Sequence, residues 1–338
     1  MRICICGGGH LGHVVAGFLA SQPENRVAML TRRPHDWADT LTITDLDGKT
    51  YRGGLWAVTD SVEEALHDTD IVLLCLPGYS ISETLLRIKD FLPPSAAVGS
   101  IVSSTGFFFQ AFKLLPATQT LFGFQRVPFI ARTREYGHSA DLLGYKPSLN
   151  IAIEHCDDKE QLRKTIESLF RCPVCLMHSH YEVSLTNSNP ILHTSRLYSL
   201  WKDYEQGRAY DAPPMFYGDW DDGSSALLIA MDNEFQRLLE QLPVRKGAIP
   251  TILDYYESSD ASSLTRKLCS IRAFGGIVAP MMQTPKGWVP DFTSRYFTED
   301  FPFGLKFIHD TMRQQSLASP VIDRVIEWGL SKAGHPII

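Results

Sequence analysis

The 338-residue chain is 44% apolar and 21% charged, a balance typical of globular proteins, and it is long enough for two domains. Its formal net charge of −6 argues against a nucleic-acid partner, because nucleic-acid-binding surfaces are rich in Lys and Arg. No apolar run reaches the ~18 residues of a membrane span, and residues 1–6 lead into a glycine cluster without the features of a secretion signal. We therefore expect no membrane partner.

The seven cysteines indicate a reducing compartment. Their number is odd, and Cys4, Cys6 and Cys75 lie inside apolar strand-like runs, where a thiol behaves as a small hydrophobic group. A disulfide framework is therefore not expected, and the cytoplasm is the predicted location.

The first half of the chain alternates short apolar runs with helical patterns, which predicts a parallel α/β sheet. The run 71–76 is apolar throughout, as in a strand buried on both faces, and Pro77 with Gly78 ends it. Before this run, Ser61 can cap a helix over 61–70, with Glu64 as its capping-box partner. The predicted strands are 2–6, 26–31, 71–76, 97–102, 148–153 and 174–178, and a helix is predicted over 157–170.

From about residue 181 strand signals fade and helical spacing dominates, so an all-helical second domain is expected. We place the boundary within 178–185 and divide the chain into 1–180 and 181–338. The apolar residues of 225–242 share one stripe, and Pro243 ends that helix. Further helices are predicted over 264–274, 303–316 and 321–333, the last with Pro320 in its first turn.

Gly7, Gly9 and Gly12 form a G-x-G-x-x-G pattern between a predicted strand and a predicted helix. In this setting the first glycine allows the tight turn, the second lets a pyrophosphate approach, and the third lets the helix pack closely. The helix N-terminus then offers free N–H groups to the phosphates. A plain glycine-rich turn is the alternative interpretation.

The pattern predicts an N-terminal Rossmann domain that binds a nicotinamide dinucleotide. We assign four further residues to the cofactor site, namely His10, Leu11, Leu76 and Pro77. An NAD site usually has Asp or Glu at the end of the second strand, but Thr31, Arg32 and Arg33 stand there. Two guanidiniums suit a 2′-phosphate and adenine stacking, so NADP(H) is preferred over NAD(H); otherwise they are solvated loop residues.

Two polar segments mark the second domain. In the first, Asn187 to His193, Pro190 can occupy helix position N1 with Asn189 as N-cap, which places His193 in the first turn. In the second, Arg295 to Gly304, polar and aromatic residues precede the predicted helix 303–316.

The whole chain resembles the opine dehydrogenases of the octopine and nopaline type, within the 6-phosphogluconate dehydrogenase and ketopantoate reductase superfamily. The resemblance rests on the glycine loop, an Asn-x-Asn-Pro-x-x-His motif at 187–193 and an Arg-x-x-x-Glu-Asp-x-Pro-x-Gly motif at 295–304. It implies a Rossmann domain followed by an all-helical domain, and NAD(P)H-dependent reduction of the imine formed from an amino acid and a 2-oxo acid. His193 matches the family's catalytic histidine, Asp300 its partner, and Arg295 the preceding arginine.

The chain also departs from the family. Many well-known members prefer NADH, whereas Arg32 and Arg33 favour NADPH. Residues 199–223, where substrate choice could be made, match nothing in the family pattern.

Elementary chemistry agrees with these roles. Hydride transfer to a C=O or C=N group leaves charge that a proton must neutralise, and a histidine titrates near neutral pH. A carboxylate on its other nitrogen would fix the tautomer and stabilise the imidazolium. Substrate carboxylates favour a planar bidentate partner, for which Arg295 is the first candidate and Arg126, after an expected strand, the second.

Each site residue also has a purely structural interpretation. His193 could be a capping or packing residue, Asp300 could cap the helix 303–316, and Arg295 could form a surface ion pair. Asn187 and Asn189 are typical of turns and caps, with Asn189 retained as a candidate substrate contact.

Two other functions remain open from the sequence. One is a ketopantoate-reductase-like 2-oxo acid or ketone reductase, although such enzymes often use a lysine and none lies in 187–193. The other is a protein that senses NADP(H) without turnover. Six aromatic residues of the second domain are interpreted as a pocket wall, core or dimer contact: Trp201, Tyr204, Tyr210, Phe216, Tyr217 and Trp220. A homodimer is left open.

A metal site is not expected. Cys172, Cys175, His178 and His180 could be drawn as zinc ligands. However, residues 172–178 are predicted to form a strand whose side chains alternate between faces, so four ligands do not converge. Packing is the predicted role of the two cysteines.

Overall fold

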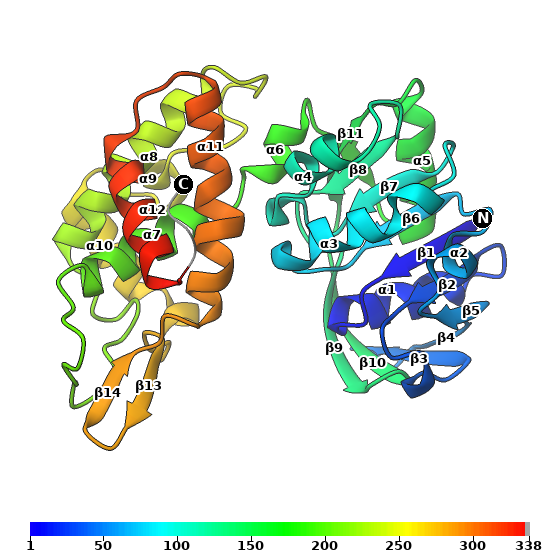
Figure 1. Cartoon of the computed structure of the whole chain (residues 1–338), viewed down its shortest axis with the longest axis horizontal. Helices are drawn as coiled ribbons and strands as arrows, with labels where there is room; N and C mark the ends of the chain where they lie inside the picture. The colour runs from blue at the N-terminus through cyan, green and yellow to red at the C-terminus, as the bar shows by residue number, and fades with distance from the viewer. Residues whose placement is uncertain (335–338) are drawn as a thin grey trace. The chain divides into compact units, whose positions relative to one another are not determined.

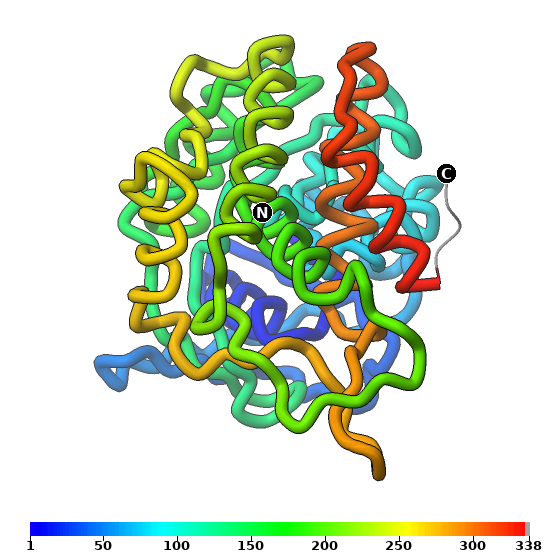
Figure 2. Tube along the Cα trace, turned by 90° about the vertical axis from the view of Figure 1, so that its left-hand side faces the viewer, coloured from blue at the N-terminus to red at the C-terminus, as the bar shows by residue number. Residues whose placement is uncertain are grey.

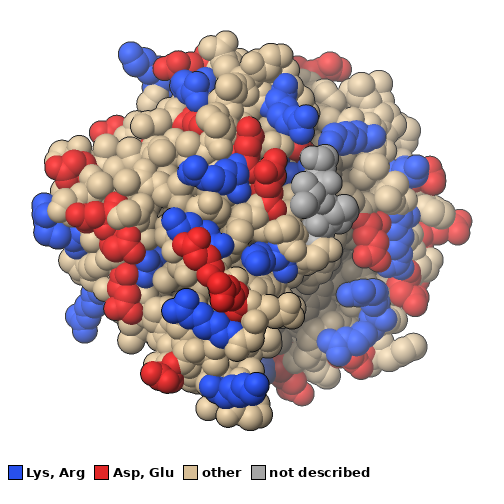
Figure 3. All heavy atoms as spheres, turned by 60° about the vertical axis from the view of Figure 1, so that its left-hand side comes forward, with Lys and Arg blue, Asp and Glu red and all other residues tan. Residues whose placement is uncertain are grey.

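The computed structural model describes residues 1–334 and divides after Ser184 into two compact units. The sequence placed this boundary after residue 180. No helix of the described chain is long and apolar enough to cross a membrane. On the face drawn in Figure 3, acidic and basic side chains are interspersed.

The first unit is built on an eight-stranded sheet with strand order β12-β11-β8-β7-β6-β1-β2-β5 (Figure 1). Neighbouring strands are parallel except for β8 and β11, which are antiparallel. The strands are β1 (Arg2–Cys6), β2 (Arg26–Leu30), β5 (Ala57–Thr59), β6 (Ile71–Leu74), β7 (Ala97–Ser100), β8 (Leu121–Phe124), β11 (Leu149–Glu154) and β12 (Val174–Leu176). The six predicted strands are confirmed with small shifts at their ends, and β8 is the strand expected before Arg126. Strand β5 was not predicted.

The sheet is buried on both faces, which explains its continuous apolar runs. In β1, Ile3 and Ile5 belong to one core while Cys4 and Cys6 belong to the other. The helices of this unit are α1 (His10–Ala20), α2 (Val62–Leu66), α3 (Gly78–Ile88), α4 (Phe107–Leu114), α5 (Lys159–Phe170) and α6 (His180–Ser184). Ser61 is confirmed as the N-cap of α2, since its hydroxyl accepts from the Glu64 N–H. The predicted capping box was wrong, because the Ser61 N–H donates to the Thr59 hydroxyl instead, and the helix ends at Leu66 rather than at 70.

A second sheet in this unit was not predicted. It has the order β4-β3-β10-β9 and consists of β3 (Thr40–Asp45), β4 (Thr50–Gly54), β9 (Phe129–Glu135) and β10 (Ser139–Tyr145). Helix α1 packs against it so closely that a Cβ on Gly17 would lie 2.5 Å from Ile43. These strands lack long apolar runs and carry exposed polar residues, so their pattern is weak.

Buried His13 connects the glycine loop to this second sheet. Its Nδ1 lies 2.9 Å from the Gly9 carbonyl oxygen, and its Nε2 accepts a 2.7 Å hydrogen bond from the N–H of Gly137, in the β9–β10 turn. The ring also stacks on Trp37 with centroids 4.3 Å apart. These partners require the neutral Nδ1–H tautomer, and burial lowers the pKa of His13 below its ordinary value.

The second unit is mainly helical and contains α7 (Asn189–Trp201), α8 (Asp222–Leu239), α9 (Ile252–Tyr255), α10 (Ala261–Ser270), α11 (Lys306–Gln314) and α12 (Pro320–Lys332). Helix α7 contacts both α8 and α12 (Figure 2). The predicted helices are confirmed, although 264–274 ends its α-helix at Ser270. The expectation of an all-helical domain was wrong in one detail, because β13 (Met281–Thr284) and β14 (Gly287–Pro290) form an antiparallel hairpin.

The segment predicted as the start of a helix at 303 has unusual geometry. Tyr296–Leu305 is a π-helix that contains Pro302 and continues into α11. Such wide turns are rare and concentrate at functional sites. Phe301 of this segment packs so closely on α12 that a Cβ on Gly329 would lie 1.9 Å from its ring.

We predict that His13 makes the stability of the first unit depend on pH. Above the unfolded-state pKa of about 6.5 both states are neutral. As pH falls from there toward the lowered folded-state pKa, the unfolded state binds more protons and stability is lost. His13→Leu should flatten this dependence and cost about 1–3 kcal/mol at neutral pH, because it leaves the Gly137 N–H without its partner. Urea unfolding between pH 5 and 8 measures both effects.

The neighbouring His138 provides the matched control, because its side chain is exposed. His138→Leu should change the free energy of unfolding by no more than about 0.5 kcal/mol. Equal pH dependence in wild type and His13→Leu would contradict the assignment.

Candidate active site

The three glycines of the loop each meet a different steric requirement. Gly7 has φ +117°, and a Cβ there would lie 2.5 Å from the Cys75 carbonyl oxygen. A Cβ on Gly12 would lie 1.8 Å from the Gly7 carbonyl oxygen. By contrast, a Cβ on Gly9 would meet no described atom within 4 Å, so the surface there is open. These are the spaces that a tight turn, close helix packing and an approaching pyrophosphate need.

Helix α1 begins at His10, and its N-cap Gly9 offers no side-chain hydrogen bond. The first N–H groups are therefore available to an anion. His10 Nδ1 accepts from the Thr133 N–H at 3.0 Å, which holds the ring beside β9, and Leu11 is half-buried against the core. Leu76 and Pro77 follow β6, and Pro77 is the N-cap of α3. The first unit thus places both segments at the carboxyl edge of its parallel strands.

The end of β2 has two arginines in different environments. Arg33 lies over the Tyr136 ring, 4.1 Å from its centroid, and pairs with Asp36 at 3.4 Å. Burial of the Tyr136 phenol acts to raise its pKa. The hydrogen bond from Arg33 and the positive charge of Arg33 act in the opposite direction, and the pKa of Tyr136 is lowered overall. Arg32 is exposed and makes no hydrogen bond or ion pair within residues 1–334. Thr31 is buried and accepts from the Arg33 N–H, which shapes the turn.

In the second unit, helix α7 carries His193. The predicted start of this helix was off by one residue, because Ser188 is the N-cap and Asn189 the first helical residue. Pro190 therefore lies at the second helical position and His193 in the second turn rather than the first. The Asn187 side chain accepts from the Asn189 N–H at 3.2 Å, a turn contact that begins the helix.

His193 has a partner on each ring nitrogen. Nδ1 lies 2.8 Å from Asp300 Oδ2, and Nε2 lies 3.0 Å from the hydroxyl of Tyr217. The side chains of His193 and Asp300 are only 13% and 21% exposed, so water screens their interaction weakly. A carboxylate at Nδ1 fixes the proton on that nitrogen and stabilises the imidazolium, so Nε2 can accept and release a proton.

Asp300 comes from the π-helical segment and is not the cap of a helix that starts at 303. That structural interpretation was wrong, because the helix already runs through residues 296–305. The segment brings Tyr296 against His193 as well, with ring centroids 5.0 Å apart in an edge-to-face arrangement. One helical segment therefore supplies both the carboxylate and a wall of the imidazole site.

The predicted substrate-binding residues lie in both units. Arg295 immediately precedes the π-helical segment, is 84% exposed, and pairs with Glu299 through its Nε at 2.9 Å. Arg126 is exposed and follows β8 at the carboxyl edge of the parallel strands. Asn189 is half-buried at the start of α7. The substrate-binding roles of these three residues stay predictions.

Sequence reasoning missed several residues of these sites. Tyr136 lies beyond the glycine loop and the second strand, and nothing in its pattern marks it. Tyr217 was noted only as one of six aromatic residues, although it contacts the histidine directly. Arg196 lies one turn after His193 and is 1% exposed; a fully buried arginine in a polar-looking helix gives no signal without the structure.

The cysteines and histidines near residue 175 lie in and beside β12 and at the start of α6. Within residues 1–334 no group of three or more His, Cys, Asp or Glu side chains could hold a metal ion. Cys175 is exposed, which contradicts the packing role predicted for it, and Cys172 is half-buried. Cys4, Cys6 and Cys75 are buried as expected, and all seven cysteines are unpaired.

Known proteins share both halves of this arrangement. Residues 176–332 match the family model for the NAD/NADP octopine/nopaline dehydrogenase α-helical domain, and residues 3–133 match that for ketopantoate reductase PanE/ApbA. A tauropine dehydrogenase of Arabella iricolor is 27% identical over 98% of this chain and 91% of its own.

Solved structures have the same fold. Octopine dehydrogenase with NADH and L-arginine has a TM-score of 0.86 at 24% identity, covering 99% of this chain and 90% of its own. An NADP⁺-bound yersinopine dehydrogenase has a TM-score of 0.70 at 13% identity, covering 98% and 90%.

A dinucleotide-binding sheet and a helical unit with a histidine–carboxylate pair define an NAD(P)-dependent oxidoreductase that acts on a CH–NH group. Within that class, the helical part of the chain is similar to the octopine/nopaline dehydrogenase family, and the whole chain is similar to a tauropine dehydrogenase.

We predict that Asp300→Asn lowers kcat by about 10²- to 10⁴-fold, because the amide no longer stabilises a protonated His193. His193→Ala should abolish turnover. Both variants should bind the cofactor with unchanged Kd, since the glycine loop belongs to the other unit. Cofactor fluorescence titration and steady-state kinetics measure the two quantities separately.

His309 is the matched control, because it is also 13% exposed and faces two carboxylates, Asp310 and Asp323. His309→Ala should keep kcat within about threefold of wild type. An Asp300→Asn enzyme with normal kcat would remove the carboxylate from the mechanism.

Proposed function

We propose that this protein reduces the imine formed from a 2-oxo acid and an amino acid, with NAD(P)H as the reductant. The observation that carries the proposal is the Asp300–His193 pair in a helical unit that matches the octopine/nopaline dehydrogenase model. The relatives named above are called tauropine and octopine dehydrogenases, and that similarity supports the same reaction class here.

His193 is the acid and base of the proposed reaction. Condensation of an amine with a 2-oxo acid first gives a carbinolamine, which must lose its hydroxyl as water before the C=N bond exists. A protonated His193 supplies the proton for that departure, and Asp300 stabilises the imidazolium until it does. In the reverse direction the neutral ring accepts the proton back.

The cofactor, when bound, supplies the hydride that reduces the C=N carbon. The glycine loop and the start of α1 would hold the pyrophosphate of the cofactor. Gly7 and Gly12 make the turn tight, and the open space beside Gly9 would admit the phosphates. Leu76 and Pro77 would contact it from the end of β6. The geometry at these residues fits the group.

NADP(H) is the proposed preference. Arg33 stacked on Tyr136 forms a planar cationic surface suited to adenine, and exposed Arg32 can meet a 2′-phosphate. The solved relatives use both cofactors, since one is described with NADH and the other with NADP⁺. The preference of this chain therefore depends on its own residues at the end of β2.

We expect Arg32→Gln to weaken NADPH binding about 10- to 100-fold, which corresponds to the loss of one charge-assisted hydrogen bond of ~1.5–3 kcal/mol. NADH lacks the 2′-phosphate, so its Kd should change by no more than about twofold. Arg26→Gln is the matched control, because Arg26 is exposed at the opposite end of the same strand. Equal losses for NADPH and NADH would contradict the preference.

The two substrates each carry a carboxylate, for which arginine is the natural partner. We assign this role first to Arg295 and second to Arg126, with Asn189 as a polar contact. Arg295 would have to exchange its ion pair with Glu299 for one with the substrate carboxylate. Because the Arg295 side chain is 84% exposed, breaking that ion pair costs little free energy.

The alternatives are less well supported. The ketopantoate reductase model matches the cofactor half of the chain and not the half that carries His193. A sensor without turnover would not need a half-buried carboxylate on a histidine. A cytoplasmic location agrees with seven unpaired cysteines, and a homodimer stays open.

An assay of NADPH and NADH oxidation at neutral pH tests the reaction class. We expect oxidation only when a 2-oxo acid and an amino acid are both present. An oxo acid that suffices alone would indicate the simple reductase. Tight cofactor binding without oxidation for any pair would favour the sensor.

A further inference from the structure

Both ring nitrogens of His193 already have a hydrogen-bond partner within the second unit. Asp300 occupies Nδ1, and the Tyr217 hydroxyl occupies Nε2 at 3.0 Å. A proton that leaves the ring at Nε2 must therefore pass through Tyr217 or wait until that side chain moves away. Which of the two happens depends on how firmly Tyr217 is held.

The ring of Tyr217 is fixed on its faces. Its side chain is buried, with 4% exposure. It stacks on Phe274 with centroids 4.0 Å apart and 17° between the planes, and it lies parallel to Trp220 at 6.0 Å. Phe216 meets it edge-on at 4.9 Å. Moving the hydroxyl off His193 would break these contacts.

The backbone that carries Tyr217 is held by Arg196, one turn after His193 on α7. Its Nε donates to the Phe216 carbonyl oxygen at 2.8 Å, and its Nη2 donates to the Asp219 carbonyl oxygen at 2.6 Å. Its Nη1 donates to the Ser224 hydroxyl at 3.1 Å, and Asp221 balances its charge. Because the guanidinium is 1% exposed, little water competes for these bonds.

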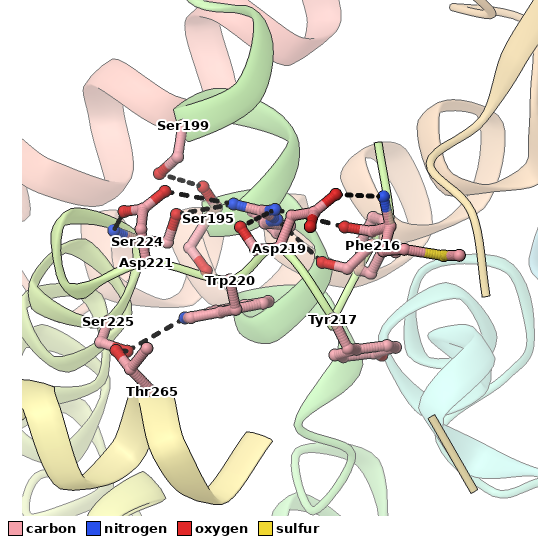
Figure 4. Close-up of polar contacts among 12 residues, drawn as sticks. Ser195, Ser199, Phe216, Tyr217, Asp219, Trp220, Asp221, Ser224, Ser225 and Thr265 are labelled. Atoms are coloured by element: carbon pink, nitrogen blue, oxygen red, sulfur yellow. Dashed lines mark hydrogen bonds and ion pairs between the residues drawn. The ribbon is translucent and has the colours of Figure 1, made fainter. Parts of the chain in front are cut away.

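Further contacts complete this anchor. Trp220 Nε1 donates to the Ser225 hydroxyl at 3.0 Å, and that hydroxyl also bonds Thr265 of α10 (Figure 4). The Cys269 thiol donates to the Tyr217 carbonyl oxygen at 3.3 Å. The segment 215–221 thus has no regular structure of its own at Tyr217 but is fixed by α7, α8 and α10.

We propose that Tyr217 relays the proton between His193 and the substrate, and that Arg196 is the positioning residue that holds Tyr217 on the ring. The proposal rests on the proposed function, because it concerns the same proton transfer. It adds a third member, a phenol, to the histidine–carboxylate pair.

The relay exchanges one proton for another. As the C–O bond of the carbinolamine breaks, the Tyr217 O–H proton goes to the departing oxygen, which leaves as water. The Nε2 proton of His193 goes to the Tyr217 oxygen at the same time, so the ring ends neutral and the phenol keeps one proton. The C=N bond forms from the nitrogen lone pair, and no electron is gained or lost by the protein.

The surroundings of Tyr217 keep it neutral outside that moment. Burial raises its pKa, and the nearby Tyr296, Tyr256 and Asp300 raise it further. A phenolate is therefore disfavoured. Tyr217 passes a proton on without becoming charged, and His193 is the group that is protonated before the transfer and neutral after it.

Tyr217→Phe tests the relay, because it removes the hydroxyl and keeps the stacked ring. We expect kcat to fall about 10- to 100-fold while KM for both substrates and Kd for NADPH change by no more than about threefold. Tyr198→Phe, on the same helix as His193 and packed on Trp328, is the matched control and should keep wild-type kcat.

The outcomes separate the two proposals. An active wild type with unchanged or increased kcat in Tyr217→Phe would show that Tyr217 only covers Nε2 and moves aside, which overturns the relay alone. A wild type without amine-dependent turnover would overturn the proposed function, and the relay with it.

Arg196→Lys tests the positioning role, because lysine keeps the charge but cannot reach the Phe216 and Asp219 carbonyls together. It should lower kcat, and the double variant with Tyr217→Phe should be no slower than the worse single variant. Losses that multiply in the double variant would mean that Arg196 acts independently of Tyr217.

Discussion

The structure of the second unit depends on one short hydrogen bond between residues far apart in the chain. His193 and Asp300 meet at 2.8 Å although 107 positions separate them. Helix α7 and the π-helical segment must therefore pack in one register, and the contact of α12 with Phe301 secures that register from the other side. This charge-assisted hydrogen bond, with both side chains mostly buried, serves the proposed acid–base chemistry and also constrains how the two helical segments pack.

The two units show what local sequence pattern can and cannot predict. Continuous apolar runs and the glycine pattern identified β1, β2, β6 and β7, because strands buried on both faces are apolar at most positions. The sheet β4-β3-β10-β9 was missed because its strands are short of apolar residues and β10 pairs in parallel with distant β3. Such long-range pairing leaves no mark in a sequence window.

The candidate sites divide in the same way. Gly7, Gly12 and the His193–Asp300 pair could be predicted, since backbone sterics and a family motif each leave a recognisable pattern. Tyr217, Arg196 and Tyr136 could not, because each acts through a contact that only the folded chain creates. A buried arginine that holds carbonyl oxygens looks, in sequence, like any polar residue on the outer face of a helix.

The π-helical segment has a consequence for how this chain can tolerate insertions and deletions. Each residue of an α-helix turns the chain by about 100°, so the loss of one residue between Asp300 and Leu305 would rotate Asp300 away relative to α11. The shorter chain would form a more regular helix and point its carboxylate elsewhere. Length at this position is thus a functional property, and a homologue with one residue fewer here would need another source for the negative charge beside its histidine.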